Sequence, residues 1–568
     1  MSNRLDRIPL AIFQRGRCAP VPMTRETDGR DGFLMLVVCV LLLILISAAY
    51  LFSERMLISN VASTGALQAR QANSLSESGI AYTKAKIQSA FQSDQGMFEW
   101  PEQWTGEVRS TIPRSDQQDK RDQLFGEFQV SCWDHERSAW IPGVADESCK
   151  LNLNHLPLDK LYAPEARRML MCIPRMTLAI ADSILDWMDE DEEQREFGAE
   201  SSYYQSKSAG AKARNQRLEQ LEDLLGVRGM TPELLYGSRA SSPWSSEPIV
   251  NFPLKSLDSM SSSSGRERLG FSAFLTVNGG PSVYRADGEK KVLVNQDDLV
   301  QLFDDLERVL GEDIATYVVA YRMVGPKDKT ILVKDEFALD AAEQTRQRAA
   351  QQRGENVESE QDASALTRVE QRGPLMIDTD GGFLVRSAYD LVGVSVEYQS
   401  EDGSLLLESP WPENDHTFDQ LLPKINEQLS FVLGTPVLAQ VNVNQSPEQV
   451  LFAVPGMLPD VVNRIVTSRD QLGIYRYSSE ARTSGKQYMA IDWLRRSGTL
   501  DLKEMRLFAP YFTNVGNAFH FMSTGISHPN KHHAHREIIL DFRYKPSRVV
   551  FARAVDSRSL LTSEVAAR

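Results

Sequence analysis

A short acidic stretch, residues 186–200, has the side chains that could bind a metal ion. It holds a single cation, Arg195, among carboxylates at Asp186, Asp189, Glu190, Asp191, Glu192, Glu193, Glu196 and Glu200. Such a cluster either stays fully solvated or binds a hard cation, and calcium takes about six to eight oxygen ligands at about 2.3–2.6 Å. Asp189 and Asp191 alternate at the expected end of a helix, and Gly198-Ala199 allows a tight return that brings Glu200 back to them. Calcium binding and a solvated acidic loop both fit this pattern.

A membrane-spanning segment lies near the N-terminus. Residues 33–52 contain no charge, and an α-helix of that length, rising about 1.5 Å per residue, spans roughly 30 Å of hydrocarbon. The apolar core of a secretory signal peptide is shorter, about 7–15 residues. Residues 1–32 are rich in arginine, and the positive-inside rule places them in the cytoplasm. The sequence therefore predicts a single pass through the inner membrane, with the C-terminal domain in the periplasm.

The helix is expected to continue past the membrane. Small and apolar residues recur near helical spacing after Arg55, at Ile58, Ala62, Gly65, Ala69, Ala72, Ile80, Ile87 and Phe91. The span and this stripe are therefore predicted to form one long helix.

The junction between residues 1–32 and the span resembles a known processing site. Arg30-Asp31-Gly32-Phe33 followed by an apolar helix is similar to the prepilin-peptidase site of type IV pilins and pseudopilins. This resemblance implies that prepilin peptidase cleaves after Gly32 and that the new amino terminus on Phe33 is methylated. Most pilin-like subunits carry Glu at the fifth mature position, whereas this chain has Val37. A charge at the centre of a bilayer costs about 2.5–3.5 kcal/mol on insertion scales, so a subunit that needs no such pairing is expected to lack it.

Loss of that Glu is typical of general secretion pathway protein K, the minor pseudopilin of type II secretion systems. Further stretches resemble this family, at 146–154, 184–191, 198–204 and 509–513. The resemblance implies a tip subunit of the pseudopilus that assembles with the minor pseudopilins I and J and performs no bond-making chemistry. Protein K is known as a calcium-binding pseudopilin, which implies calcium ligands at Asp189, Asp191, Glu200 and Glu193.

An internal repeat organises the region after residue 150. Residues 151–189 are echoed by residues 441–470, and a weaker copy runs over 292–322. Each copy begins with a short strand and continues as two short helices about a Gly or Pro turn. The sequence therefore predicts three helix-hairpin-helix units.

Such units suggest an alternative function, a membrane-anchored DNA-binding or DNA-uptake protein, because their turns can aim backbone N–H groups at a phosphate. That activity needs turn glycines and nearby cations. The first copy has Pro174-Arg175-Met176 with no glycine, and the chain carries a net charge of −15. Since phosphate affinity depends on clustered Lys and Arg, the pattern favours packing between proteins and predicts no nucleic-acid partner.

Other reactive residues form weaker patterns. Cys132 and Cys149 could form a disulfide in an oxidising periplasm, for which chain entropy suggests about 3 kcal/mol, and free thiols are the alternative. The histidines at 528–535 could bind a transition metal or could simply lie in a loop between two terminal strands. No Ser/His/Asp order, phosphate loop or zincin motif is recognisable, so no enzymatic activity is predicted.

Together these features predict an α+β fold with a long N-terminal transmembrane helix, a pilin-like antiparallel sheet and an inserted α-helical domain with helix-hairpin-helix-like repeats. Strands are expected at 126–132, 271–277, 383–385, 394–398, 518–522 and 538–544. The predicted segments are a cytoplasmic leader (1–32), the span (33–53), the periplasmic extension of its helix (54–95), a first pilin-like β segment (96–150), an inserted α-domain with the first helical unit (151–245), a linker, strand and second helical unit (246–334), a charged insertion (335–373), a β/α segment (374–438), the third helical unit (439–510), and C-terminal pilin-like strands with a tail (511–568).

Overall fold

The structure is a computed structural model, and it describes part of the chain. The predicted leader up to residue 29, the serine-rich stretch 259–265 that forms the predicted linker, and most of the charged insertion at 335–373 are not among the described residues. Those described are 30–92, 105–109, 124–134, 139–158, 163–208, 210–237, 269–285, 287–331, 370–378, 381–400, 403–413, 417–431, 440–472, 490–528 and 532–555.

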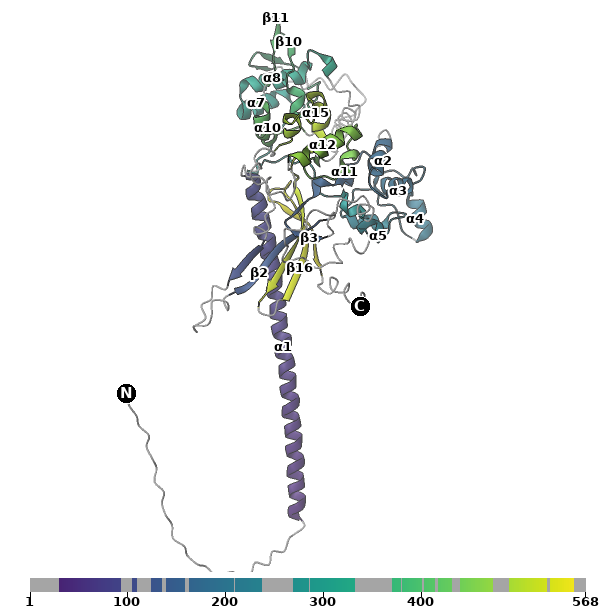
Figure 1. The fold of residues 1–568 in the computed structure, drawn as a ribbon, viewed down its shortest axis with the longest axis vertical. Helices are drawn as coiled ribbons and strands as arrows, with labels where there is room; N and C mark the ends of the chain where they lie inside the picture. Colours follow the sequence, from purple (N-terminus) through teal and green to yellow (C-terminus); the bar gives the residue numbers. More distant parts are fainter. Residues whose placement is uncertain are drawn as a thin grey trace, which may run out of the picture. The chain divides into compact units, whose positions relative to one another are not determined.

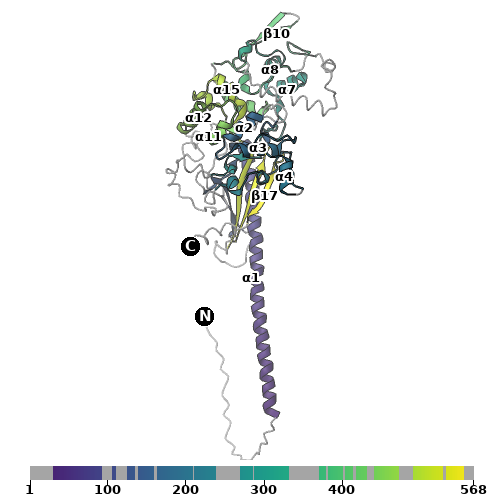
Figure 2. The ribbon, with the colours of Figure 1, turned by 90° about the vertical axis from the view of Figure 1, so that its right-hand side faces the viewer.

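The first element is a single unbroken helix, α1 (Arg30–Gln92), as both ribbon views show (Figures 1 and 2). The chain divides into two compact units, residues 1–67 and residues 68–568, so α1 belongs to both. In the first unit the apolar side chains of 33–52 are exposed, as expected of a segment that faces lipid. Among the described residues, one helix, within Phe33–Phe91, is long and apolar enough to cross a membrane. The predicted apolar N-terminal helix is therefore confirmed.

The second unit contains a seven-stranded sheet, and all its pairings are antiparallel. Its main path runs β1-β2-β15-β16-β17, while β3 pairs with β2 and β4 pairs with β15. Because β2 pairs with β15, the long intervening chain is an insertion between neighbouring strands. The strands are β1 (Thr105–Arg109), β2 (Leu124–Asp134), β3 (Ala139–Pro142), β4 (Ala145–Asp146), β15 (Ala518–Ser527), β16 (His532–Asp541) and β17 (Arg548–Val555).

The C-terminal part of α1 packs on one face of this sheet (Figure 1). Ile87 joins Phe128, Phe519 and Phe521 in a buried apolar cluster. Two serines then fasten the backbones together, because Ser76 Oγ donates to the Ser523 carbonyl at 2.9 Å and Ser523 Oγ donates to the Ser76 carbonyl at 2.7 Å. Apolar burial and these paired hydrogen bonds hold the helix against the sheet.

A glycine allows this close approach, which yields a testable prediction. A Cβ built on Gly525 of β15 would lie 2.0 Å from the carbonyl oxygen of Ala72 on α1. Gly525→Ala must therefore push the helix away from the sheet, and we expect it to lower the free energy of unfolding by about 1–2 kcal/mol in denaturant titrations. The control is Gly382→Ala, whose Cβ would meet its nearest atom, the Met323 carbonyl oxygen, at 3.6 Å. Equal stability of the two variants would contradict this packing.

The insertion contains three similar units, each closed by a two-stranded parallel pair. In each unit the opening strand is followed by two consecutive helices. The pairs are β5 (Leu151–Asn152) with β6 (Leu275–Thr276), β7 (Val292–Leu293) with β12 (Leu429–Ser430), and β13 (Val441–Asn442) with β14 (Phe512–Thr513). The helices are α2 (Ala163–Met171) and α3 (Leu178–Met188), α7 (Leu299–Leu310) and α8 (Glu312–Val324), and α11 (Glu448–Ala453) and α12 (Pro459–Gln471).

The turns between these helices have a shared backbone geometry. Each contains a residue with positive φ, namely Arg175 (65°), Gly311 (94°) and Gly456 (69°). A non-glycine residue there is strained by roughly 1 kcal/mol or more, but the Arg175 side chain compensates by donating to the carbonyls of Glu233 (3.3 Å) and Leu269 (3.4 Å). The first unit therefore turns at Arg175, where the other two units have glycine.

One asparagine has the same role in all three units. The Nδ2 atoms of Asn154, Asn295 and Asn444 donate to the carbonyl of the residue that follows the closing strand. These carbonyls belong to Val277 (3.0 Å), Phe431 (3.0 Å) and Asn514 (3.5 Å). The repeat seen in the sequence is therefore a repeat of structure, in which the asparagine ties the start of each unit to its end.

The first and third units also contact each other. Arg168 on α2 donates to the carbonyls of Phe452 (3.0 Å), Ala453 (3.1 Å) and Val454 (3.2 Å) at the C-terminal end of α11. A cation there satisfies carbonyls that have no partner within the helix. Both ribbon views show α2 beside α11 (Figures 1 and 2).

Two predicted strands differ from the structure, and for Cys132 and Cys149 it shows one of the two alternatives left open. The predicted strand at 271–277 is a strand only at β6, because residues 271–273 form a 3-10 helix. The predicted strand at 383–385 is absent, because the backbone N–H and carbonyl of Val385 bond to the Asn295 side chain at 2.9 and 2.8 Å instead of to a neighbouring strand. Cys132 and Cys149 are not joined in a disulfide, and the Cys149 thiol donates to Gln445 Oε1 at 3.6 Å. The finer segment boundaries drawn from the sequence remain predictions.

The remaining helices and strands are short. They are α4 (Ser201–Lys207), α5 (Pro232–Tyr236), α10 (Thr417–Gln428), α14 (Trp493–Arg496), α15 (Leu502–Phe508), β8 (Glu370–Arg372) paired with β9 (Leu375–Ile377), and β10 (Val396–Ser400) paired with β11 (Gly403–Leu407).

Candidate metal centre

Helix α3 arranges the carboxylates of the first unit along one of its faces. The helix begins where Thr177 Oγ1 accepts a hydrogen bond from the Ile180 N–H at 3.3 Å. Asp182, Asp186 and Asp189 follow at spacings of four and three, which places them on the same side. Asp182 is paired with Arg167 through two hydrogen bonds of 2.6 and 2.8 Å. The other two aspartates are left to form a separate site.

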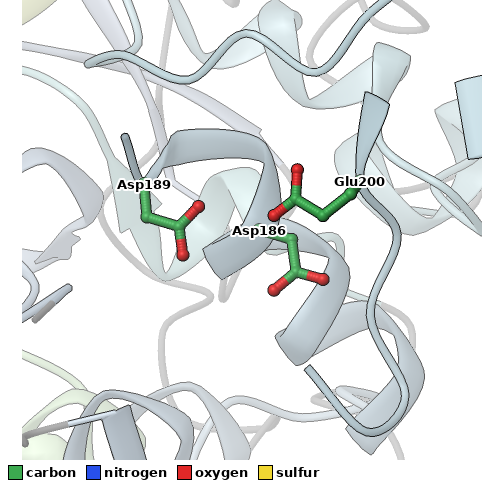
Figure 3. Close-up of side chains that lie close together, drawn as sticks. All are labelled: Asp186, Asp189 and Glu200. Atoms are coloured by element: carbon green, nitrogen blue, oxygen red, sulfur yellow. The ribbon is translucent and has the colours of Figure 1, made fainter. Parts of the chain in front are cut away.

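Glu200 joins these two aspartates from another segment (Figure 3). Each of the three residues offers an oxygen, and these oxygens lie within 4.8 Å of one another. All three residues are buried, with exposed fractions of 0% for Asp186, 6% for Asp189 and 2% for Glu200. The close-up shows the carboxylates of Asp186 and Glu200 side by side, with that of Asp189 turned toward them (Figure 3).

Gly198 permits this return of the chain. A Cβ on Gly198 would lie 1.9 Å from Asp186 Oδ2, so a larger residue would have to displace this carboxylate. Glu200 then directly precedes α4, and its side chain makes no capping hydrogen bond to that helix. The expected tight turn at Gly198-Ala199 therefore brings Glu200 to the end of α3, and leaves its carboxylate available to the cluster.

Hydrogen bonding in the cluster is incomplete. Asp186 Oδ1 accepts from Arg195 Nη1 at 2.8 Å, and Asp189 Oδ2 also accepts from that atom. Asp189 Oδ1 and both carboxylate oxygens of Glu200 are buried without a hydrogen-bond partner among the described residues. Burying an ionised carboxylate without compensation costs several kcal/mol. Three oxygens in this condition, all from hard ligands, fit a bound divalent cation such as calcium.

The pKa values of Asp189 and Glu200 are both raised, as expected of buried carboxylates without enough partners. Burial raises the pKa of Asp189 to about 6, although its bond to Arg195 acts in the opposite direction. Burial together with the negative charges of Asp186, Asp189 and Glu192 raises the pKa of Glu200 to about 8. A cation among these oxygens would favour the ionised forms and lower both pKa values again.

The structure brings together two of the four ligands inferred from the sequence, Asp189 and Glu200. Asp191 and Glu193 are not part of the described cluster, and Asp191 Oδ1 instead accepts from the Glu193 N–H at 2.8 Å. Asp186 takes the third position. Its spacing of three from Asp189 on a helix was the signal for it, since residues three apart share a face. The complete ligand set remains a prediction.

The two other candidate sites are less informative. Gly32 and Phe33 lie near the start of α1, and no contact around them tests the predicted cleavage. Of the histidines at 528–535, His535 is buried on β16 and its Nδ1 lies 2.9 Å from Thr524 Oγ1. Within the part of the chain that the structure describes, these histidines do not converge as metal ligands.

These features define a mixed helix-and-sheet protein with an apolar N-terminal helix, an antiparallel sheet and a helical insertion that contains a carboxylate cluster. Residues 149–237, which contain that cluster, match the family model described as type II secretion system (T2SS), protein K. Over these residues the chain is similar to type II secretion protein K, as the sequence resemblance implied.

The structure was also compared with solved structures. A chain of "The Crystal Structure of the GspK-GspI-GspJ complex from enterotoxigenic Escherichia coli Type 2 Secretion System" is similar at 11% identity and a TM-score of 0.30, covering 87% of this chain and 99% of that one. No curated protein matches the sequence significantly. The family assignment therefore rests on residues 149–237.

Proposed function

We propose that this protein caps the tip of the type II secretion pseudopilus as its minor pseudopilin K, and so takes part in protein secretion across the outer membrane. The observation that carries this proposal is the protein K match over residues 149–237. The protein acts as a structural subunit in this proposal and not as an enzyme.

The architecture supports a pilin-like subunit. A long helix whose N-terminal part is apolar packs by its C-terminal part on an antiparallel sheet, which is the arrangement a subunit needs to enter a helical filament through its helix. The insertion between β4 and β15 adds three helical units to this sheet. Such a large head would hinder another subunit from stacking above it, so the subunit would fit only at the end of a filament.

Placement in the inner membrane follows from the same helix. Residues 33–53 would span the bilayer, residues 1–32 would lie in the cytoplasm before processing, and the sheet and insertion would be periplasmic. The minor pseudopilins I and J are the proposed neighbours, through the N-terminal helix.

Processing by prepilin peptidase provides the test of this assignment. Because Gly32 directly precedes the apolar helix, the peptidase is expected to remove residues 1–32 before assembly. Mass spectrometry of the membrane-extracted protein should find a methylated Phe33 as the first residue, and Gly32→Leu should retain the leader. An assembled protein that begins at Met1 would overturn the pseudopilin assignment.

The carboxylate cluster is proposed to bind calcium through Asp186, Asp189 and Glu200. When bound, the ion would neutralise the buried carboxylates. The residues of the chain would then hold the loop after α3 in one conformation, because Asp186 and Asp189 come from the helix and Glu200 from the returning segment.

A DNA-binding role for the three hairpin units receives less support. The turn of the first unit is formed by Arg175, whose side chain bonds to carbonyls of its own unit and so is not directed at a phosphate. The acidic residues 189–193 follow in the same unit. We therefore propose that the helix-hairpin-helix-like units pack against protein.

A further inference from the structure

We propose that Arg195 is a built-in counter-ion of the carboxylate site, which sets the charge of the site to that of one divalent cation and orients two of its ligands. This inference rests on the proposed calcium site and names a positioning and selectivity role for a residue outside the ligand set. The supporting observation is which carboxylate oxygens bind Arg195 and which have no hydrogen-bond partner.

Arg195 binds both carboxylate oxygens of Asp186 and one of Asp189, and it leaves the second Asp189 oxygen open. Its Nη1 donates to Asp186 Oδ1 at 2.8 Å and to Asp189 Oδ2, and its backbone N–H lies 3.3 and 3.2 Å from the two Asp186 oxygens. Asp189 Oδ1 has no hydrogen-bond partner among the described residues, and neither has either oxygen of Glu200. The guanidinium therefore holds the two aspartates, while the unpartnered oxygens of Asp189 and Glu200 remain for an ion.

The orientation of Arg195 is itself fixed by the fold. Its side chain is 11% exposed, and its Nη2 donates to the Leu158 carbonyl at 3.3 Å. Leu158 precedes α2, whereas Arg195 lies in the segment between α3 and α4. The Leu158 carbonyl, which lies outside the cluster, therefore holds the guanidinium in place. A residue that orients metal ligands needs such a fixed position.

The charges in direct contact add up to the charge that a divalent ion neutralises. Asp186, Asp189 and Glu200 contribute three negative charges when ionised, and Arg195 contributes one positive charge, which leaves two negative charges. The nearby Asp182 is already neutralised by Arg167. Glu190, Glu192 and Glu193 are exposed and do not contact the cluster carboxylates, so solvent screens their charges, although that of Glu192 still acts on Glu200.

Removal of the Arg195 charge should change which ions the site prefers. A site with three uncompensated carboxylates attracts a trivalent ion more strongly than a divalent one, because the added attraction grows with the charge of the ion. The loss of the guanidinium also frees Asp186 and Asp189 to rotate, which weakens calcium binding. The change in charge favours the trivalent ion over calcium, whereas the loss of orientation weakens binding. The ratio of the two affinities therefore separates the two effects.

The test measures calcium by isothermal titration and terbium by its luminescence, on full-length protein in detergent. We expect Arg195→Gln to weaken calcium binding and to raise the ratio of terbium to calcium affinity by about tenfold or more. Arg195→Lys keeps the charge but not the planar fork, so it should weaken both ions while keeping a ratio near that of the unmutated protein. Arg214→Gln removes a cation that pairs with Glu219 and Asp223 in the same unit, and it should leave both affinities unchanged.

Each other result would overturn the proposal in a recognisable way. An equal loss of both ions in Arg195→Gln, with the ratio unchanged, would show a purely structural role. Tighter calcium binding in Arg195→Gln would show that the arginine competes with the ion. Absence of binding of either ion to the unmutated protein would refute the calcium site itself, whereas the assignment as protein K would still stand on residues 149–237.

Discussion

Calcium is expected to raise the free energy of unfolding by about 2.7 kcal/mol when its free concentration is a hundredfold above its dissociation constant. The physical reason is the set of buried, unpartnered oxygens on Asp189 and Glu200, which an ion would satisfy in the folded state only. Thermal melting of the full-length protein in detergent, with calcium and with a chelator, measures this effect. Equal midpoints in the two conditions would refute the site.

Paired variants identify the ligands. Asp186→Asn combined with Glu200→Gln should abolish the calcium-induced rise in melting temperature, because both side chains belong to the buried cluster. The matched control is Asp191→Asn combined with Glu193→Gln, which removes the same charge from the loop that lies outside the described cluster. The control should retain most of the rise. The opposite result would favour the ligand set inferred from the sequence over the one the structure brings together.

Stability is expected to fall as the pH rises from about 6.5 to 9, because of a half-buried histidine where the insertion meets the sheet. His520 on β15 lies between two carboxylates, with its Nε2 2.9 Å from Glu537 Oε1 and its Nδ1 3.6 Å from Glu147 Oε1. Burial alone would lower the pKa of His520, but the bonds to Glu147 and Glu537 outweigh it and raise the pKa to about 9.

A histidine whose pKa is higher in the folded than in the unfolded state stabilises fully below the unfolded value, near 6.5, and loses this contribution as the pH rises through the folded value. The shift corresponds to about 2 kcal/mol after allowing for solvent at the partly exposed ring. Denaturant titrations at pH 6 and pH 9.5 should show this loss in the unmutated protein and not in His520→Gln. The difference between the two proteins cancels other titrating groups, so identical pH profiles would contradict the charged histidine.

Local sequence patterns predicted those elements that are specified by residues close together in the sequence. The uncharged run at 33–52 is enough to specify the start of α1, because its length and composition match a bilayer. The segments that open the three units, each with an asparagine two residues after its short strand, were visible as a repeat. Their function, in which Asn154, Asn295 and Asn444 close each unit by bonding to a distant carbonyl, depends on contacts that no local pattern encodes.

Long-range pairing explains what the sequence could not predict. The pairing of β2 with β15 joins segments separated by the whole insertion, and no spacing rule connects them. The same limit applies to the metal site. Asp191 was chosen by alternation after the helix end, whereas the helical face extends from Asp186 to Asp189 and the third carboxylate, Glu200, returns through a turn that Gly198 permits.

The most direct test of the proposed role is the position of this subunit on the pseudopilus. Electron microscopy of isolated pseudopili, with a label attached to the insertion at an exposed residue of the β10–β11 hairpin such as Ser404, would locate it. The proposal predicts one label at a single end of each filament, because the three helical units of the insertion would hinder further stacking. Labels at regular intervals along the filament shaft would contradict it.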